Sequence, residues 1–415
     1  MIHLEYDVVV IGAGPAGLSA AVSAKKNGVS NVLLVERGES LGGILNQCIH
    51  EGFGIHRYNE TLTGPEYAQR HIDELHEHKI NYMLSSMVLE LSAEKKLLVS
   101  SPAGLHEIKA KAVILAMGCR ERTRGQICIP GTRPAGIYTA GAAQYFMNLR
   151  GYRVGEKIVI LGSGDIGLIM ARRLTLEGAK VLAVVELMPY SNGLPRNMAQ
   201  CLQDFEIPLY LKHTVINIQG KDRLESVTIA EVDSRFKPVE GTKKKIECDT
   251  LLLSVGLIPE NELTRKAGIE IDKSLGSAVV DSDLATSIQG IFACGNALQV
   301  HDLVDYVSLE GERAGKSAAE YVKNPQRNKE IIKAKPGMGI RYVLPQNLVK
   351  GADAHLSMRV LAPETKMNLI ISSKGRTIKQ TSMRKVNPAE MVHVDLKAKE
   401  IEGCDELEVR LENAK

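Results

Sequence analysis

The chain has 415 residues, 44% of them hydrophobic, which is enough for about two or three packed domains. Its net charge is only +3 and it has no Trp, so we expect no nucleic acid as a partner. No apolar stretch approaches the roughly 20 residues of a membrane-spanning helix, and no basic leader precedes the first strand-like segment. We therefore expect a cytoplasmic protein without direct membrane insertion.

The cysteines limit the kinds of disulfide and metal site that the chain can form. There are seven, an odd number, and no two of them have CxxC spacing. This pattern argues against a disulfide framework and against a structural zinc site, so no metal is expected. Most of these cysteines should be small buried apolar residues in a reducing compartment.

The first chemical signal is a glycine-rich turn between a strand and a helix. Residues 7–11 are a continuous apolar run, typical of a buried parallel strand, and the helix is expected over 18–27. In the turn, Gly12 suits the sharp change of direction and Gly14 the close approach of a pyrophosphate, while Gly17 lets the helix pack on the strand. The N-terminus of the helix offers free N–H groups to phosphate oxygens.

A carboxylate completes this first motif. A second strand over 31–35 ends at Glu36, which lies 24 residues after Gly12. At this spacing the carboxylate can accept hydrogen bonds from both ribose hydroxyls of a dinucleotide. A GxGxxG pattern alone is weak, but strand, glycines, helix, strand and acid occur here in the required order.

The same motif recurs later in the chain. A strand over 157–161 leads into the turn Gly162–Gly167, a helix is expected over 168–177, and a strand over 180–185 ends at Glu186. The spacing from the first glycine to the acid is again 24 residues. Two such motifs predict two dinucleotide sites, or one chain built from duplicated modules.

The second acid also indicates which nicotinamide cofactor binds. A carboxylate at Glu186 would accept from a free ribose 2′-hydroxyl and repel a 2′-phosphate. Residues 187–191 contain no Arg that could bind such a phosphate. NAD(H) is therefore favoured over NADP(H), with the alternative that Glu186 is only a solvated strand end and both cofactors bind.

These segments resemble the two-dinucleotide flavoproteins, the superfamily that contains glutathione and thioredoxin reductases. Val113–Gly118 is similar to the strand and turn that end the first FAD segment, and Thr286–Asn296 to the second FAD signature. Leu253–Pro259 is similar to the return from the NAD domain to the FAD domain. The family usually has Asp where this chain has Asn296, which weakens one expected contact to the ribityl chain. The resemblance covers roughly residues 1–325.

A narrower resemblance concerns flavoprotein subunits of multi-component dehydrogenases. The segments that carry it are Gly42–Gly54, Gly118–Arg122 and Pro130–Gly141. Members of this group include the alpha subunits of opine and sarcosine oxidases, hydrogen cyanide synthase subunits and the NADH-linked partner of bacterial glycerol-3-phosphate dehydrogenases. The resemblance implies a partner: a second flavoprotein dehydrogenase subunit in a hetero-oligomer.

The chain lacks the cysteine pair that a disulfide reductase requires beside its flavin. In glutathione-reductase relatives the pair follows the Gly-Gly turn, but here residues 42–50 contain only Cys48. In thioredoxin-reductase relatives a CxxC precedes the second glycine motif, but here residues 137–143 contain no cysteine. We therefore expect no disulfide-reductase activity.

The single Cys48 and His50 are the candidate catalytic residues. Cys48 could cycle through a sulfenic acid, but we favour simple packing near the flavin, because no helix N-terminus or adjacent Lys is evident to lower its pKa. His50 with Glu51 could handle a proton, with the alternative that the two form an ion pair in a loop. Arg120 and Arg122 could touch a phosphate or have a purely structural role.

We expect an α/β fold with two Rossmann-like dinucleotide-binding domains, for FAD and NAD, the second inserted in the first, and a small C-terminal all-β domain. The FAD-binding domain is predicted over 1–122 and 259–325, and the NAD(P)-binding domain over 123–258. A polar, proline-bounded linker is expected over 324–337. The C-terminal domain, 337–415, is predicted to be β-sandwich-like.

The C-terminal prediction depends on alternating apolar and polar residues. Such alternation occurs over 355–361, 391–396 and 407–411, and Ser373–Arg376 suggests a hairpin turn. This domain contains no catalytic constellation. We expect it to dock a partner subunit, with the simpler alternative that it only covers part of the core.

Together these features predict an FAD-dependent NAD(H) oxidoreductase that passes hydride between flavin and nicotinamide, as the electron-transfer subunit of a glycerol-3-phosphate or amino-acid/amine dehydrogenase. The alternatives are a stand-alone NADH oxidase or peroxidase that uses Cys48, and a non-catalytic scaffold subunit. The predicted cofactor-binding residues are Gly12, Gly14, Pro15, Ala16, Gly17, Glu36, Arg37, Gly42, Gly43, Cys48, Val88, Ala116, Gly118, Gly162, Ser163, Gly164, Asp165, Ile166, Glu186, Val255, Gly256, Gly295 and Asn296.

Overall fold

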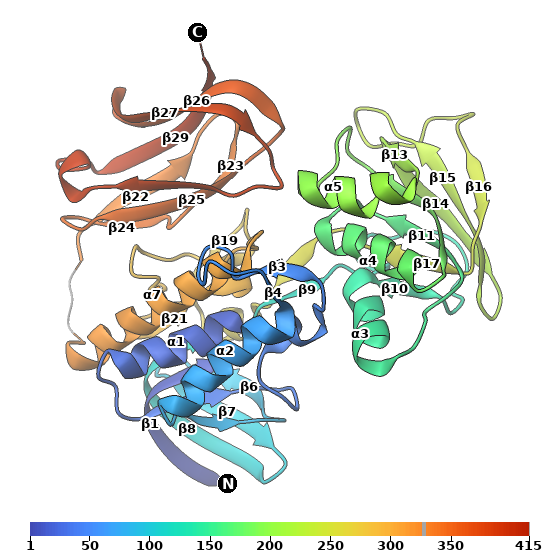
Figure 1. The fold of residues 1–415 in the computed structure, drawn as a ribbon. Helices are drawn as coiled ribbons and strands as arrows, with labels where there is room; N and C mark the ends of the chain where they lie inside the picture. Colours follow the sequence, from blue (N-terminus) through green and yellow to red (C-terminus); the bar gives the residue numbers. More distant parts are fainter. Residues whose placement is uncertain (326–328, 415) are drawn as a thin grey trace. The chain divides into compact units, whose positions relative to one another are not determined.

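The computed structural model describes residues 1–325 and 329–414, and the chain divides into two compact units. The first unit contains Met1–Cys119 and the chain from Pro259 onward, and the second contains Arg120–Ile258 (Figure 1). The chain passes between them at strands β9, Cys119–Glu121, and β18, Leu257–Pro259. Among the described residues, no helix has both the length and the apolar character needed to cross a membrane.

The first unit is built on a largely parallel sheet with strand order β5-β2-β1-β8-β7-β6, and β21 also pairs with β8. Only β6 and β7 run antiparallel to their neighbours. The central strand β1 is apolar along its second half, where Val8, Val9 and Val10 are fully buried, as in a parallel strand that is covered on both faces. The strands are β1 Ile2–Ile11, β2 Val32–Val35, β5 Asn81–Met83, β6 Met87–Leu91, β7 Lys96–Ser101, β8 Gly104–Leu115 and β21 Ile291–Ala293.

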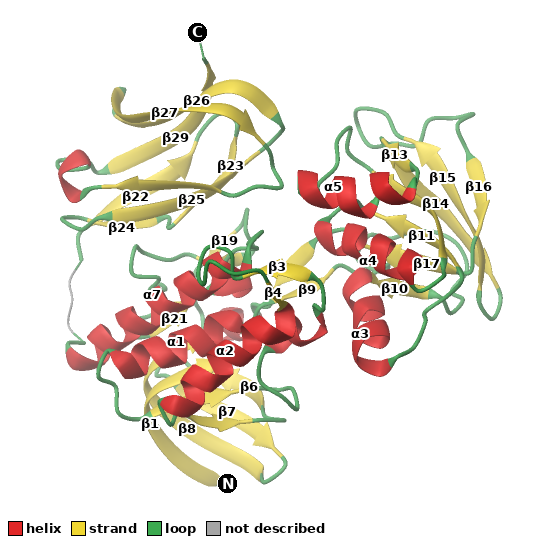
Figure 2. Ribbon diagram, viewed as in Figure 1, coloured by secondary structure: helices red, strands yellow, loops and turns green. Residues whose placement is uncertain are grey.

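Three helices of this unit lie side by side: α1 Pro15–Lys26, α2 Gly64–Glu77 and α7 Val304–Lys323 (Figures 1 and 2). Helices α1 and α7 approach closely because α7 has glycines at the contact. A Cβ atom on Gly311 or Gly315 would lie 2.2 Å from a backbone oxygen of α1. Shorter elements complete the unit: η1 Gly43–Gln47, β3 Glu51–Phe53, β4 Leu62–Thr63, α6 Glu262–Lys266, β19 Ile271–Asp272, β20 Ser277–Ala278 and η3 Gly295–Ala297.

The second unit repeats the same arrangement on a smaller scale. Its sheet is parallel, with order β10-β17-β11-β12-β13, and a three-stranded antiparallel sheet, β14-β15-β16, accompanies it. The strands are β10 Ile137–Thr139, β11 Lys157–Leu161, β12 Lys180–Glu186, β13 Leu209–Leu211, β14 His213–Gly220, β15 Leu224–Glu231, β16 Lys244–Glu247 and β17 Thr250–Leu253. The helices are α3 Ala140–Arg150, α4 Asp165–Leu176, α5 Pro195–Cys201 and the short η2 Gln203–Phe205.

The C-terminal part of the first unit is a β-sandwich with its own apolar core (Figure 2). One sheet has the order β24-β22-β29-β26-β27 and the other the order β23-β25-β28. The elements are β22 Ile331–Pro336, β23 Ile340–Leu344, β24 Asn347–Val349, β25 Ala354–Val360, β26 Glu364–Ser373, β27 Arg376–Val386, β28 Val392–Leu396, η4 Ala398–Glu400 and β29 Glu406–Asn413. Alternation along these strands places apolar side chains between the sheets.

These observations confirm the predicted fold class, with two Rossmann-like modules and a C-terminal all-β part. The predicted hairpin at Ser373–Arg376 joins β26 to β27. The linker prediction was wrong over 331–336, where β22 buries Ile332 and Ala334 although the lysines between them made the segment look solvated. Residues 326–328 of the predicted linker lie outside the described residues. Four of the seven cysteines are buried.

Candidate functional site

The first glycine turn forms a backbone cradle at the end of β1. The N–H of Gly12 donates to the carbonyl of Val35 at 2.8 Å, which draws the turn across the ends of both strands. Gly12 has φ +102°, and a Cβ there would lie 2.4 Å from the carbonyl oxygen of Ala116. A Cβ on Gly17 would lie 1.8 Å from the carbonyl oxygen of Gly12. Both positions therefore require glycine for packing.

Gly14 has a different role. It is the N-cap of α1, and a Cβ at this position would meet no protein atom within 4 Å. The first turn of α1 carries no acidic residue and begins with Pro15, which has no N–H to leave unpaired. The positive end of the helix thus faces open space beside a residue without a side chain. This arrangement fits the pyrophosphate of a dinucleotide such as FAD.

Glu36 clamps the cradle at the end of β2. Its carboxylate accepts hydrogen bonds from Ala13 N–H and Gly38 N–H, each at 2.7 Å. The side chain is half-buried. Two backbone donors hold the carboxylate in place and leave acceptor capacity for the ribose hydroxyls that the sequence predicts.

A short segment, Gly42–Cys48, lies across the first cradle. Gly42 N–H donates to the carbonyl of Ala13 at 2.9 Å, and a Cβ on Gly43 would lie 2.9 Å from the Cα of Gly14. Burial raises the pKa of Cys48 to about 12, so its thiol is neutral at physiological pH. The ring of His50 packs 5.0 Å from that of Phe53. This environment disfavours a reactive thiolate.

The second turn, Gly162–Gly167, repeats this geometry in the other unit. Gly162 N–H donates to the carbonyl of Val185 at 2.7 Å, and a Cβ on Gly162 would lie 2.1 Å from the carbonyl oxygen of Ser254. The carboxylate of Glu186 accepts from Ser163 N–H at 2.9 Å and Met188 N–H at 2.8 Å. Ser163 Oγ adds a third bond at 2.6 Å, and Glu186 is only 4% exposed.

The second cradle differs in what holds its covering segment, Ser191–Asn197. Asp165, in the first turn of α4, accepts from Leu194 N–H at 2.8 Å and from Asn197 Nδ2 at 2.6 Å. Asn192 N–H donates to Ser163 Oγ at 3.0 Å. The turn, clamp and helix N-terminus fit a second dinucleotide, but here an acidic side chain stands at the N-terminus of the helix.

The remaining predicted cofactor-binding residues, most of them outside the two glycine turns, differ in burial and contacts. Gly295 packs against the start of α1, where its Cβ would lie 2.6 Å from the Cβ of Ala16. The Oδ1 of Asn296 accepts from His301 N–H at 3.1 Å. The other predicted positions are as follows: Gly118 has φ +71° and a Cβ open to space, Gly256 has φ +101°, Val88 and Ala116 are buried, Val255 and Ile166 are half-buried, and Arg37 is exposed.

Sequence reasoning missed Glu310, which stabilises the second FAD-like segment. This carboxylate, 5% exposed, accepts from Gly295 N–H at 2.6 Å, from Gln299 Nε2 at 2.9 Å and from His301 Nε2 at 3.2 Å. Burial opposes its ionisation, yet His301, Gln299 and Arg313 together hold its pKa below the usual value. No local motif reveals this contact, since Glu310 lies on α7, separate in sequence from the loop that it supports.

The fold and the two cradles define a class of protein, the flavoprotein oxidoreductases with two dinucleotide-binding modules. The chain belongs to the family of pyridine nucleotide-disulphide oxidoreductases, whose sequence profile matches residues 6–400. Members of this family are FAD-dependent oxidoreductases that use NAD(P)H, so the chain is an FAD-dependent enzyme.

Curated relatives include subunits of multi-component enzymes and thioredoxin reductases. The hydrogen cyanide synthase component HcnB of Pseudomonas protegens is 27% identical, over 64% of this chain and 60% of its own length. An opine oxidase subunit of Agrobacterium tumefaciens is 26% identical, over 70% and 61%. Thioredoxin reductase of Bacillus subtilis is 25% identical, over 79% and 98%. The chain thus spans about three fifths of the length of the first two relatives.

Solved structures support the fold. Thioredoxin reductase of Lactococcus lactis superposes with a TM-score of 0.65 and 24% identity, covering 77% of this chain and 99% of that one. The enzyme of T. acidophilum gives a TM-score of 0.64 with 23% identity, covering 76% and 98%.

Proposed function

We propose that the chain passes hydride equivalents between NAD(H) and FAD in the cytoplasm, as the electron-transfer subunit of a multi-subunit dehydrogenase. The observation that carries this proposal is the pair of matching cradles, each with a carboxylate clamped by two backbone N–H groups. FAD, when bound, supplies the redox chemistry, and the protein supplies binding, orientation and electrostatics. The organic substrate would be oxidised by a partner of the glycerol-3-phosphate or amino-acid/amine dehydrogenase type.

The residues of the first unit would hold FAD. The turn Gly12–Gly17 and the N-terminus of α1 would bind its pyrophosphate, and Glu36 its ribose. Gly118, Gly295 and Asn296 would line the rest of the cofactor, with Glu310 keeping the Gly295 loop in place. The Nδ2 of Asn296 would donate to the ribityl chain, because its Oδ1 already accepts from His301 N–H.

The residues of the second unit would hold NAD(H). Gly162, Gly164 and the N-terminus of α4 would bind the pyrophosphate, and Glu186 the adenosine ribose. NAD(H) is favoured over NADP(H), because a 2′-phosphate would meet a buried carboxylate that already has three donors.

The absence of disulfide-reductase activity is part of the proposal. Within the described residues no cysteine forms a disulfide, and no two of the seven have CxxC spacing. The raised pKa of Cys48 argues against the alternative of an oxidase or peroxidase that uses a thiolate at this position. HcnB and the opine oxidase relative are subunits of multi-component enzymes, which supports a partner for this chain.

The proposal is tested by anaerobic titration of the FAD-loaded chain with NADH and with NADPH. We expect NADH to bleach the flavin, NADPH to do so at least about tenfold less effectively, and Glu186→Gln to weaken NADH while FAD stays bound. Glu177→Gln, at the exposed end of α4, is the matched control. A flavin that remains oxidised with saturating NADH would contradict the relay and favour the scaffold alternative.

A further test concerns the partner. Purification of the tagged chain from its native cell should yield a second flavoprotein that oxidises an organic substrate. Recovery of the chain by itself, with rapid oxygen consumption on NADH, would favour a stand-alone oxidase.

A further inference from the structure

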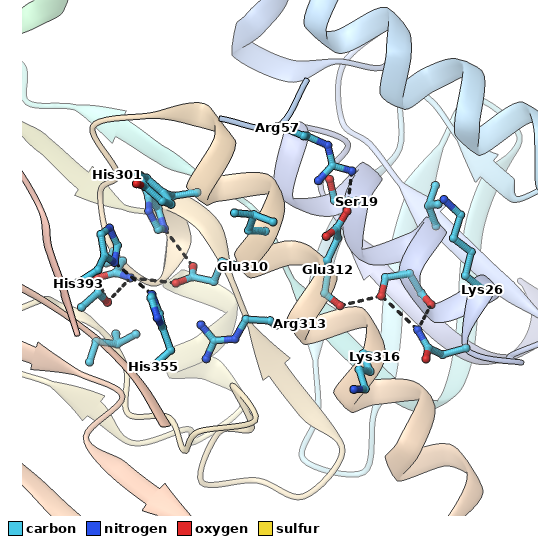
Figure 3. Close-up of a pocket in the computed structure, with 18 of the residues that line it drawn as sticks. Ser19, Lys26, Arg57, His301, Glu310, Glu312, Arg313, Lys316, His355 and His393 are labelled. Atoms are coloured by element: carbon cyan, nitrogen blue, oxygen red, sulfur yellow. Dashed lines mark hydrogen bonds and ion pairs between the residues drawn. The ribbon is translucent and has the colours of Figure 1, made fainter. Parts of the chain in front are cut away.

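A cavity of about 690 Å³ lies in the first unit, and none of its lining residues is among those predicted to bind a dinucleotide (Figure 3). Its walls come from the outer faces of α1 and α7 and from strands β25 and β28 of the C-terminal sandwich. Ligand sites for small molecules have volumes of about 300–1,000 Å³. The cavity is therefore large enough for a metabolite.

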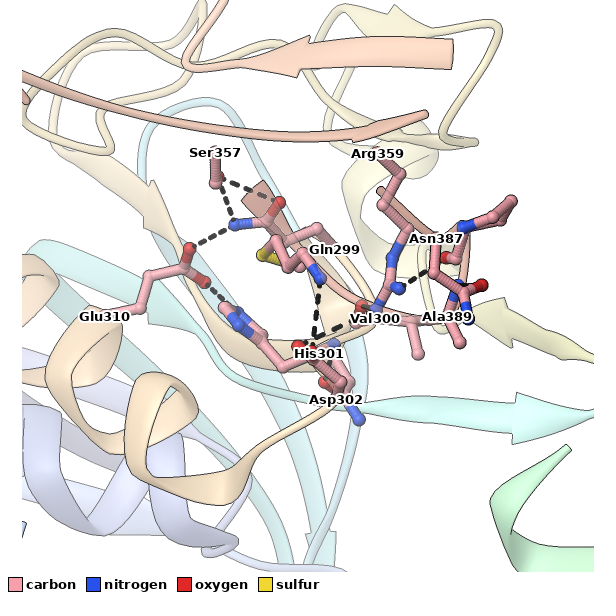
Figure 4. Close-up of polar contacts among 12 residues, drawn as sticks. Gln299, Val300, His301, Asp302, Glu310, Ser357, Arg359, Asn387 and Ala389 are labelled. Atoms are coloured by element: carbon pink, nitrogen blue, oxygen red, sulfur yellow. Dashed lines mark hydrogen bonds and ion pairs between the residues drawn. The ribbon is translucent and has the colours of Figure 1, made fainter. Parts of the chain in front are cut away.

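The wall between α7 and the sandwich is held by buried hydrogen bonds (Figure 4). Gln299 Nε2 donates to Ser357 Oγ at 2.8 Å and to Glu310 Oε1 at 2.9 Å, and both Gln299 and Ser357 are buried. Arg359 Nη2 donates to the carbonyl of Val300 at 2.9 Å. The cavity is thus bounded by fixed contacts on this side.

All three carboxylates of the cavity are already paired. Glu310 accepts three hydrogen bonds from the wall, as described above. Glu312 accepts from Arg57 Nη2 at 2.5 Å, and Glu74 accepts from Lys26 Nζ at 2.9 Å. The acidic side chains therefore offer little further capacity to a ligand.

The two cationic side chains that α7 contributes to the cavity have few hydrogen-bond partners. Tyr306, Leu309, Arg313 and Lys316 recur at helical spacing and place one face of α7 along the cavity. Within the described chain, Lys316 has no hydrogen bond or ion pair. Arg313 makes one hydrogen bond, to the carbonyl of Ser282 at 3.3 Å, and its charge also acts on Glu310. These two cations can accommodate an anionic group.

Two histidines at the other end each have an unpaired ring nitrogen. His301 Nε2 hydrogen-bonds Glu310 at 3.2 Å, and its Nδ1 is buried without a partner in the described residues. His355 Nδ1 faces Asp395 at 2.6 Å, and His355 Nε2 faces His393 Nδ1 at 3.2 Å. With the proton of His355 on Nδ1, His393 donates from Nδ1 and keeps an acceptor at Nε2.

The Nε2 of His393 is likewise buried without a partner in the described residues. Burial lowers the pKa of His393 to about 4, so its ring is neutral at physiological pH. Buried polar atoms are nearly always hydrogen-bonded, and two unpaired imidazole nitrogens in the wall of one cavity need an explanation. A ligand hydroxyl, which can both donate and accept, would supply the missing partners.

We propose that this cavity binds a small hydroxylated metabolite with one anionic group, which lies between Arg313 and Lys316 while its hydroxyls face His301 and His393. The anionic group can be a phosphate or a carboxylate, since both accept from cationic donors. This inference goes beyond the electron relay, because the site shares no residue with either cradle, although Glu310 and His301 in its wall bond the segment at Gly295 and Asn296 that is predicted to bind FAD.

Isothermal titration of the full-length, FAD-loaded chain without NAD(H) tests this site at constant ionic strength. The probes are ribose 5-phosphate and gluconate, with ribose and inorganic phosphate as fragments. We expect saturable binding of one anionic polyol and at least about tenfold weaker binding of both fragments. Ribose 5-phosphate binding alone would identify a phosphate ligand, and gluconate binding alone a carboxylate ligand.

Variants locate the binding. Lys316→Glu, on an exposed position that should not affect folding, is expected to weaken binding at least about tenfold. Lys323→Glu, on the same helix but outside the cavity, is the matched control and should bind as the unmodified chain does. Saturable binding of neither probe, or equal binding by the two variants, would overturn the proposal. Either result leaves the NADH titration of the relay unaffected.

Discussion

The two glycine cradles share one backbone design but differ in two side chains. Each residue of the second lies 150 positions after its counterpart in the first, so Ala13 corresponds to Ser163 and Pro15 to Asp165. In both, the strand-end carboxylate accepts from the residue after the first glycine and from the residue two positions after the acid. The clamp is thus a property of the backbone arrangement.

The difference lies in what surrounds the clamp. Glu36 is half-buried and has two backbone donors, whereas Glu186 is buried and has a third donor, Ser163 Oγ. The helix N-terminus of the first cradle carries no acid, and that of the second carries Asp165, which holds the covering segment. A dinucleotide phosphate meets less repulsion in the first cradle. This difference suits a resident FAD and an exchangeable NAD(H).

The largest expected effect is on folding. Gly17→Ala places a Cβ 1.8 Å from a backbone oxygen, whereas the Cβ of Gly167→Ala first meets the side chain of Ser254, at 2.7 Å. The clash at Gly17 is much the closer of the two, so we expect a loss of about 3 kcal/mol for the first and about 1 kcal/mol for the second. Urea unfolding of each variant measures the difference. Equal losses would show that the two turns pack alike.

The second prediction separates packing from binding. The Cβ of Gly14→Ala meets no protein atom, so this variant should fold normally but hold FAD about tenfold to a hundredfold less tightly. Gly125→Ala, whose Cβ would lie 3.9 Å from the nearest side-chain atom, is the control. Flavin retained on gel filtration and the apparent unfolding midpoint report the two properties. Full flavin retention in Gly14→Ala would remove the first cradle from the FAD site.

Local sequence was sufficient to predict these cradles. Three glycines, a helix, a strand and an acid follow within 24 residues of the first glycine. Each contact of the clamp joins the acid either to a residue of this motif or to the residue two positions after it. Contacts across longer separations were not predictable. Glu310 supports Gly295, and Gln299 bonds Ser357 across 58 residues, without a motif at either end. Strand β22 was missed because its lysines and Pro336 resemble a linker.

The third prediction concerns the acid at the second helix N-terminus. Asp165→Asn keeps an oxygen that can accept from Leu194 N–H but removes a negative charge beside the expected pyrophosphate. NADH should bind about two- to fivefold more tightly, the usual size of a helix-terminus charge effect. Anaerobic NADH titration of the flavin gives the dissociation constant, and Asp204→Asn serves as a control on a short helix elsewhere in the unit. Weaker binding in Asp165→Asn would mean that closure of the covering segment matters more than repulsion.

The smallest expected effect concerns the segment that covers the first cradle. Because burial raises the pKa of Cys48 to about 12, its thiolate is scarce at neutral pH and Cys48→Ser should change the rate of NADH-dependent flavin reduction less than about twofold. Alkylation by iodoacetamide tests the ionisation directly in a Cys128→Ser background, which removes the exposed cysteine. The alkylation rate at Cys48 should still be rising between about pH 7 and about pH 10, with no plateau in that range. A plateau near neutral pH, together with loss of turnover in Cys48→Ser, would contradict this prediction. It would instead favour an oxidase that uses the Cys48 thiolate beside the first cradle.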